Sequence, residues 1–178
     1  MYSTLELNYM GVEMLATVLE DGRQFVLEAV RDLPAEHAST KPGPERWSVL
    51  ECMEHIVIVE ERFLGWIISG REITPDSSWE KETRLSNMVV DRSFKATAPE
   101  AVRPDGRFKT IEEAVEAFTA ARERTARMVE ERGAELYKVG VTHPRFGDMN
   151  GVELVHILSG HAKRHAAQIR EVRESLGC

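Results

Sequence analysis

Four helix-start signatures constrain the fold of this 178-residue chain more than any other feature. In each one, a Ser, Thr or Asn is followed three residues later by Glu, the capping-box pattern that satisfies the first free N–H groups of a helix. The pairs are Ser3 with Glu6, Ser48 with Glu51, Thr110 with Glu113, and Asn150 with Glu153. Each pair opens a stretch with apolar residues at helical spacing.

These stretches predict helices over residues 3–33, 48–69, 110–133 and 150–177, with Pro34 and Gly133 as stop signals for the first and third. Because almost no other segment has a strand pattern, we predict an all-α four-helix bundle that forms a single domain over residues 1–178. Residues 137–141 are a short extended candidate, and 142–147 are predicted to form a loop.

The connections between the predicted helices differ greatly in length. Residues 34–46 are rich in helix breakers and are predicted to be irregular. Residues 70–109 are predicted to hold only one short helix, near 80–94. A connection this long inside a compact domain favours a crossover between the second and third helices over a simple up-down-up-down bundle.

Composition narrows the class of function. The net charge of -7 argues against a nucleic-acid partner or an anionic membrane surface. Cys52 and Cys178 make neither a disulfide framework nor a metal-ligand spacing, and the first residues lack the basic and apolar regions of a secretory signal. No apolar run approaches the roughly 20 residues of a membrane span. We therefore expect a soluble cytoplasmic protein.

Histidines on the predicted second and last helices are the candidate site. His161 and His165 are four residues apart, which places them about 40° apart on one helix face, together with apolar neighbours. His55 lies on the apolar face of the second helix. The alternative is that these are ordinary hydrogen-bonded core histidines. Three imidazoles without a carboxylate would instead hold a divalent ion and leave a coordination position open.

Other polar residues have two alternative interpretations or a surface role. Gln168, one turn beyond His165, is a candidate to position a ligand or water, or else a packing glutamine. Arg62, on the same side as His55, is a candidate pocket residue or salt-bridge partner. Charged residues on the third helix are interpreted as a solvated surface: Glu112, Glu116, Arg122, Glu123, Arg124, Arg127 and Glu130.

A di-iron carboxylate site is the competing bundle chemistry, and it requires two Glu-x-x-His motifs. The chain has one, formed by Glu153 and His156. Helical counting places His156 about 140° from His161, which predicts an outward position. The di-iron interpretation therefore fails on the sequence.

Several short motifs, in order along the chain, resemble the DinB-like (DinB/YfiT-like) superfamily. They are Arg46-Trp47-Ser48-x-x-Glu51-x-x-x-His55-Ile56, Ala98-Pro99-x-x-Val102-x-Pro104-x-Gly106, Phe146-Gly147, and His161-x-x-x-His165-x-x-Gln168-Ile169. The resemblance implies up-down-down-up connectivity, a divalent metal ion bound by His55, His161 and His165, and a homodimer.

Some relatives in that superfamily are thiol S-transferases and a thiol-dependent isomerase. The resemblance therefore implies a metal-dependent enzyme that acts on a small molecule, with the metal activating a low-molecular-weight thiol. Imidazole ligands suit zinc, nickel, copper and iron, and of these we expect zinc or nickel. Hydrolysis by metal-bound hydroxide is the second hypothesis. A non-catalytic, dimeric, metal-binding bundle in stress response is the third.

Overall fold

The computed structural model describes residues 4–74, 79–93 and 97–178, and the side chains of all of these except 4–13, 79 and 80. Its described residues are mainly helical, with a small sheet. The helices are α1 (Thr4–Val30), α2 (Ala35–Ala38), α3 (Val49–Ile68), α4 (Trp79–Val90), α5 (Ile111–Arg132) and α6 (Gly151–Leu176). The short 3-10 helices are η1 (Glu100–Val102) and η2 (Gly133–Lys138). The strands are β1 (Arg71–Glu72), β2 (Val139–His143) and β3 (Gly147–Asn150).

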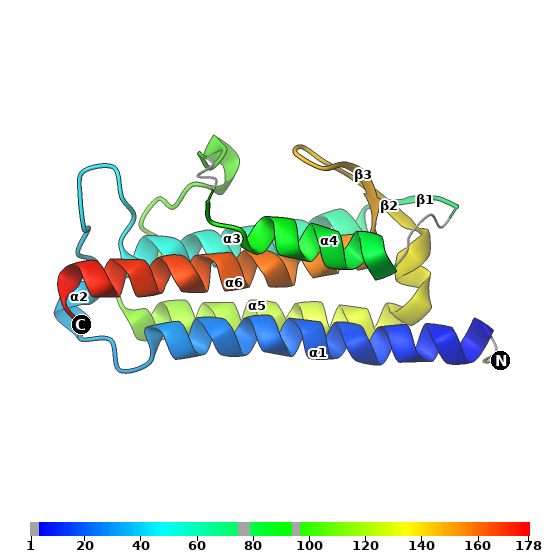
Figure 1. Ribbon diagram of the computed structural model, residues 1–178, viewed down its shortest axis with the longest axis horizontal. Helices are drawn as coiled ribbons and strands as arrows, with labels where there is room; N and C mark the ends of the chain where they lie inside the picture. Colours follow the sequence, from blue (N-terminus) through cyan, green and yellow to red (C-terminus); the bar gives the residue numbers. More distant parts are fainter. Residues whose placement is uncertain (1–3, 75–78, 94–96) are drawn as a thin grey trace.

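Helices α1, α3, α5 and α6 pack side by side in two layers. Figure 1 shows α1 beside α5 in one layer and α3 beside α6 in the other, and contacts join α1 with α6 and α3 with α5 across the layers. In that view α1 and α6 run from right to left, whereas α3 and α5 run from left to right. Buried apolar side chains from all four helices fill the space between the layers, including Val26, Met53, Phe118 and Ile169.

Capping boxes start three of these long helices, as predicted. Ser48, Thr110 and Asn150 each accept a hydrogen bond from the backbone N–H three residues later, and the Glu at that position accepts one from the cap residue. The fourth predicted box involves Ser3, which lies outside the described residues. These reciprocal bonds fix the first turns of α3, α5 and α6, and hence the register of the residues that each presents to the core.

The first helix ends earlier than predicted. It was expected to reach Leu33 and stop at Pro34, but α1 ends at Val30 and Asp32 has a left-handed backbone, with φ of 54°. Asp tolerates that conformation better than most residues, and Pro34 disfavours helical geometry at Leu33. Residues 34–46 are also not wholly irregular, because Pro34 precedes the short helix α2.

The connection between α3 and α5 contains the predicted short helix. It was expected over residues 80–94 and is observed as α4, Trp79–Val90, packed against α6 (Figure 1). Its position overturns one prediction. His156 on α6 was expected to point outward, but it is buried, and its Nε2 atom lies 3.6 Å from Oε2 of Glu82 on α4. Helical counting gave the right direction but could not show that α4 covers that face.

The segment before α6 is a hairpin: the extended candidate at 137–141 overlaps β2, and the predicted loop at 142–147 is shortened to a turn at 144–146 between two strands. Strands β2 and β3 pair antiparallel, with His143 opposite Gly147 and Gly140 opposite Asn150, and β1 pairs with the other edge of β2. Gly147 has a φ of 75°, which glycine adopts readily after the tight turn at residues 144–146. Asn150 ends β3 and caps α6, so the hairpin delivers the chain directly into the last helix.

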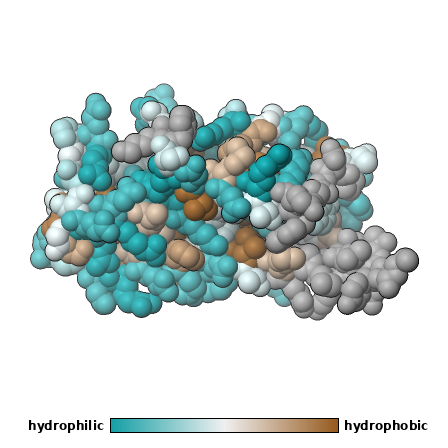
Figure 2. All heavy atoms as spheres, viewed as in Figure 1, coloured by the Kyte–Doolittle hydropathy of each residue, from teal (hydrophilic) through white to brown (hydrophobic). Residues whose placement is uncertain are grey.

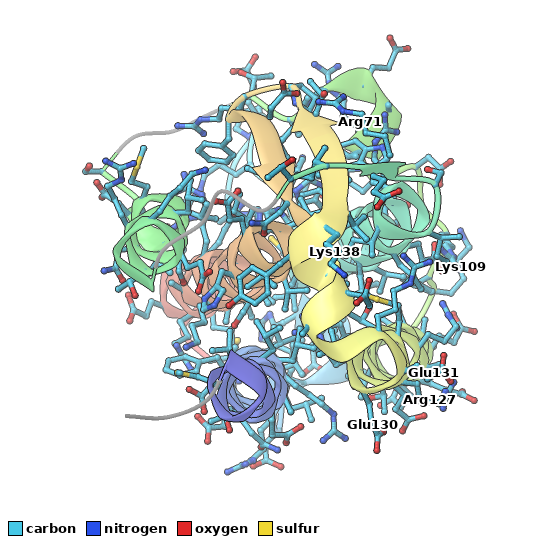
Figure 3. The ribbon with its side chains drawn as sticks, turned by 90° about the vertical axis from the view of Figure 1, so that its right-hand side faces the viewer. Arg71, Lys109, Arg127, Glu130, Glu131 and Lys138 are labelled. Carbon is cyan, nitrogen blue, oxygen red and sulfur yellow. The ribbon has the colours of Figure 1, made fainter. Side chains whose placement is uncertain are left out.

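One residue of the predicted solvated surface of α5 is buried. Arg122 donates from Nη2 to Oε2 of Glu60 on α3 at 2.8 Å and from Nη1 to the carbonyl oxygen of Leu19 at 3.1 Å. The other six predicted surface residues are exposed. Figure 3 shows Arg127 and Glu130 pointing away from the bundle. The prediction of a solvent-exposed side chain was wrong for Arg122, because its guanidinium forms an ion pair with the buried carboxylate of Glu60.

The face of the molecule shown in Figure 2 is largely polar where its residues are coloured. Most residues on the face shown in Figure 2 are hydrophilic, with scattered apolar ones among them. Among the described residues, no helix combines the length and apolar character needed to cross a membrane.

Candidate metal centre

Helices α3 and α6 bring the three predicted histidines together. Ligand-type atoms of His55, His161 and His165 all lie within 4.8 Å of one another. The Nε2 atoms of His55 and His161 are 3.0 Å apart, and the three ring centroids are separated by 4.4 to 4.9 Å. The convergence follows from the fold, because α3 and α6 pack directly against each other and each presents its histidines at the contact.

The ring of His55 is oriented by the crossover segment. Its Nδ1 atom lies 2.6 Å from the carbonyl oxygen of Val102 in η1. A carbonyl oxygen only accepts hydrogen bonds, so Nδ1 carries the proton. The Nε2 lone pair is therefore free and faces His161, the state in which an imidazole binds a metal.

The ring of His165 is oriented from within α6. Its Nδ1 atom lies 3.0 Å from Oε1 of Gln168, and the same oxygen accepts a second hydrogen bond from Nη1 of Arg92 at 3.3 Å. Gln168 therefore lies beside the histidine group, where it contacts one of the three predicted ligands. As with His55, the bond at Nδ1 leaves the lone pair on Nε2.

His161 completes the group, and the position of its ring nitrogens shows whether a metal ion would fit. The residue is partly exposed, but its Nδ1 atom is buried without a hydrogen-bond partner among the described residues. Metal–imidazole bonds of about 2.0–2.1 Å place two nitrogen ligands of one ion roughly 3–3.5 Å apart, close to the observed separation of the His55 and His161 nitrogens. The three nitrogen donors suit a borderline ion such as zinc or nickel.

The surroundings keep all three rings neutral near neutral pH. Burial lowers the pKa of His55, and it lowers the pKa of His161 and His165 well below the usual range. The proximity of the rings to one another and to Arg164 adds to the effect on His161 and His165. Only the neutral imidazole binds a metal, so the three rings are in the protonation state that coordination requires.

An aromatic side chain covers one side of the group. The Trp47 ring lies 4.9 Å from the ring of His55 and 6.1 Å from that of His165, measured between centroids. Cys52, three residues before His55, is fully buried, and burial raises the pKa of its thiol to about 12. It is therefore a neutral core residue and not a nucleophile.

Glu54 is the residue of this region that the sequence reasoning missed. It is buried on α3 beside His55 and accepts hydrogen bonds from three consecutive backbone N–H groups, those of Asp105, Gly106 and Arg107, at 2.7 to 3.1 Å. These bonds anchor the turn that follows η1. The signal was present in the Pro104-Asp105-Gly106 turn sequence, which exposes backbone donors, but the sequence did not show which carboxylate would accept from them.

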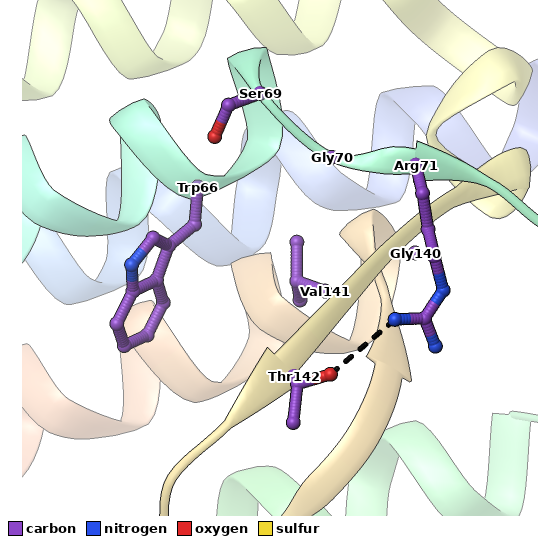
Figure 4. A pocket seen from close by; sticks show the side chains of 7 residues that line it. All are labelled: Trp66, Ser69, Gly70, Arg71, Gly140, Val141 and Thr142. Carbon is purple, nitrogen blue, oxygen red and sulfur yellow. Dashed lines mark hydrogen bonds between the residues drawn. The ribbon is translucent and has the colours of Figure 1, made fainter.

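Arg62 does not join the histidines. It is exposed two turns further along α3, with its guanidinium over the Trp66 ring at 5.2 Å. Trp66 also lines a separate pocket at the junction of α3 with β1 and β2, together with Gly70, Arg71 and Thr142 (Figure 4). None of the three histidines lines that pocket.

The family model described as the DinB superfamily matches residues 19–169. The chain belongs to this superfamily. The match includes His55, His161 and His165 and confirms the resemblance found in the motifs. The chain is also similar to the uncharacterized protein YuaE of Bacillus subtilis (strain 168), with 21% identity over 160 residues that cover 90% of this chain and 98% of YuaE. Membership in the DinB superfamily and the histidine group are together compatible with metal binding.

Proposed function

We propose that His55, His161 and His165 hold a divalent metal ion, zinc or nickel, and that the protein is a metal-dependent enzyme acting on small molecules. The observation that carries the proposal is the facing pair of Nε2 atoms on His55 and His161, 3.0 Å apart, beside the third ring of His165. Two of these rings have their Nδ1 protons committed to an acceptor, so each keeps its lone pair on Nε2 for a metal ion.

The make-up of the group favours a reactive site over a structural one. Its members are three neutral histidines, and no carboxylate belongs to it within the described residues. Structural zinc sites are usually closed by four protein ligands, whereas three leave a position for a substrate or water. His161 is partly exposed, so the group is reachable from solvent on that side.

Within this proposal the reaction is transfer of a low-molecular-weight thiol to an electrophile. When bound, a divalent ion supplies Lewis acidity and favours the thiolate form of a thiol ligand. The three histidines hold the ion, Gln168 and the carbonyl of Val102 orient two of them, and the Trp47 ring shields one side from water. The proposed fold is the up-down-down-up bundle, and the helix directions in Figure 1 support it.

The test uses protein loaded with zinc or nickel, cysteine as the thiol and 1-chloro-2,4-dinitrobenzene as the electrophile. A sulfur–carbon bond forms, chloride leaves and the thiol proton passes to solvent. We expect turnover that depends on the added metal and is lost in His161→Ala but kept in His143→Ala, because His143 lies outside the group.

Two other results would contradict thiol transfer. Metal-dependent cleavage of p-nitrophenyl acetate without any thiol, together with no reaction of the chloroarene, would favour the hydrolytic hypothesis. Metal binding with no turnover of either substrate would favour the non-catalytic bundle.

A further inference from the structure

The crossover segment reaches the histidine group a second time, through Arg92. This residue follows α4, and its guanidinium makes two bonds to Glu171 on α6, Nε to Oε1 at 2.7 Å and Nη2 to Oε2 at 2.6 Å. The remaining nitrogen, Nη1, donates to Oε1 of Gln168 at 3.3 Å. Arg92 is therefore held by a forked ion pair, and one donor is aimed at the glutamine that touches His165.

The chemistry of these groups fixes which atom donates and which accepts in each hydrogen bond from Arg92 through Gln168 to His165. A guanidinium has only donors, so the group that Gln168 turns toward Arg92 must be its oxygen and not its NH₂. That same oxygen lies 3.0 Å from Nδ1 of His165. An oxygen accepts, so the proton of the neutral His165 ring must be on Nδ1.

Without Arg92 the glutamine has no such restriction. A side-chain amide can present either its oxygen or its NH₂ to a neighbouring ring nitrogen, and the two orientations select opposite imidazole tautomers. With NH₂ toward His165, Nδ1 would accept and the proton would move to Nε2, the ring nitrogen that Gln168 does not contact. That tautomer cannot bind a metal through Nε2.

We propose that Arg92 is a positioning residue for the metal centre: through the oxygen of Gln168 it fixes His165 in the tautomer that keeps Nε2 free. The inference deepens the proposed function and rests on it for its consequence, because a free Nε2 matters only if a metal binds there. The tautomer itself is a property of the metal-free protein.

This assigns a role to the crossover between α3 and α5. One part of it supplies the carbonyl of Val102 to His55, and another supplies Arg92 to Gln168. Arg164, between the two histidines of α6, donates to the carbonyl oxygens of Val89 and Asp91 and holds the end of α4 in place. Two of the three rings therefore depend on this segment for their orientation.

The experiment reads the tautomer of His165 from the ¹⁵N shifts of its ring in metal-free protein, in wild type and in three variants. Arg92→Met removes the hydrogen-bond donor to Gln168, and Arg92→Lys keeps a donor at this position. Arg84→Met, which changes an exposed arginine on α4, is the control. We expect the Nδ1–H form in wild type, Arg92→Lys and Arg84→Met, and a mixture of both forms in Arg92→Met. Helical circular dichroism checks that each variant is folded.

The same four proteins are then titrated with zinc against a chelator. We expect Arg92→Met to bind about tenfold more weakly than wild type, in line with losses of tenfold or more when a ligand's hydrogen-bond partner is removed. A pure Nδ1–H form in Arg92→Met, or an equal change in Arg84→Met, would overturn the inference. If wild type bound no zinc, the proposed function would fail, but the ring spectra would still decide what Arg92 does.

Discussion

The Nδ1 atom of His55 lies 2.6 Å from the carbonyl oxygen of Val102, a residue 47 positions further along the chain. The bond orients one ring of the candidate metal centre from a segment that belongs to neither helix of that centre. Glu54, the preceding residue of α3, holds the turn at residues 105–107 that follows Val102. Glu54 and His55, two consecutive residues of α3, therefore hold the crossover segment beside the histidine group through hydrogen bonds.

Replacing Glu54 with glutamine should weaken the hydrogen bonds that hold the turn at residues 105–107. A glutamine offers one acceptor oxygen, and its NH₂ would face backbone donors that only a carboxylate satisfies. We expect the free energy of unfolding to fall by about 1–3 kcal/mol, since buried N–H groups lose their acceptors. Zinc affinity should fall by roughly tenfold as Val102 shifts from His55.

Urea denaturation and zinc titration measure the two effects of Glu54→Gln. The matched control is Glu61→Gln on the same helix, whose carboxylate binds the side chain of Arg107 at the surface. It should cost less than about 1 kcal/mol, as exposed ion pairs do. Equal losses in the two variants would show that the anchoring by Glu54 has no special role.

The ion pair between Glu60 and Arg122 should behave as a buried pair. Both groups are withdrawn from water, which raises the pKa of Glu60 and lowers that of Arg122. The charge of each group offsets part of the desolvation cost of the other. Arg122→Met leaves the carboxylate buried without its cation and should destabilise the protein by about 3–5 kcal/mol.

The double variant Glu60→Leu/Arg122→Met should recover most of that loss, because both buried charges are then gone. Thermal and urea unfolding of the two variants provide the comparison. If the double variant were as unstable as the single one, packing at the Arg122 position, and not an uncompensated charge, would be the cause.

His143 provides a pH-dependent prediction outside the metal centre. Burial, with a smaller contribution from Arg145, lowers the pKa of its imidazole to about 4. In the unfolded chain the pKa is about 6.5, so between these values the unfolded state binds more protons. Stability should therefore be fully present above about pH 6.5 and should fall as the pH drops toward 4.

Proton NMR of the His143 ring over a pH titration measures this directly. The His143 resonance should titrate with a midpoint near 4. The His143→Gln variant should lose less stability than wild type on acidification over the same interval. A wild-type midpoint near 6.5 would contradict the burial argument.

Local sequence rules predicted the parts of the fold that depend on nearby residues. The capping boxes at Ser48, Thr110 and Asn150 set the starts of three long helices correctly, because a cap bonds to residues only three positions away. Helical spacing likewise predicted that His161 and His165 share a face with the core, and that His55 points inward.

The features that could not be predicted depend on contacts between distant segments. His156 is buried because α4 covers it, and Arg122 is buried because Glu60 on α3 meets it. The orientation of His55 by Val102 and the anchoring of residues 105–107 by Glu54 arise from packing of the crossover. Periodicity describes the faces of a single helix, and it contains no information on which segment will lie against each face.

Elemental analysis of gently purified protein tests the central claim most directly. It is performed beside the triple variant His55→Ala/His161→Ala/His165→Ala and beside His143→Ala as the control. The account predicts about one divalent ion per chain in wild type and in the control, and none in the triple variant. An equal metal content in the triple variant, or no metal in wild type together with an unchanged melting temperature on adding zinc or nickel, would contradict it.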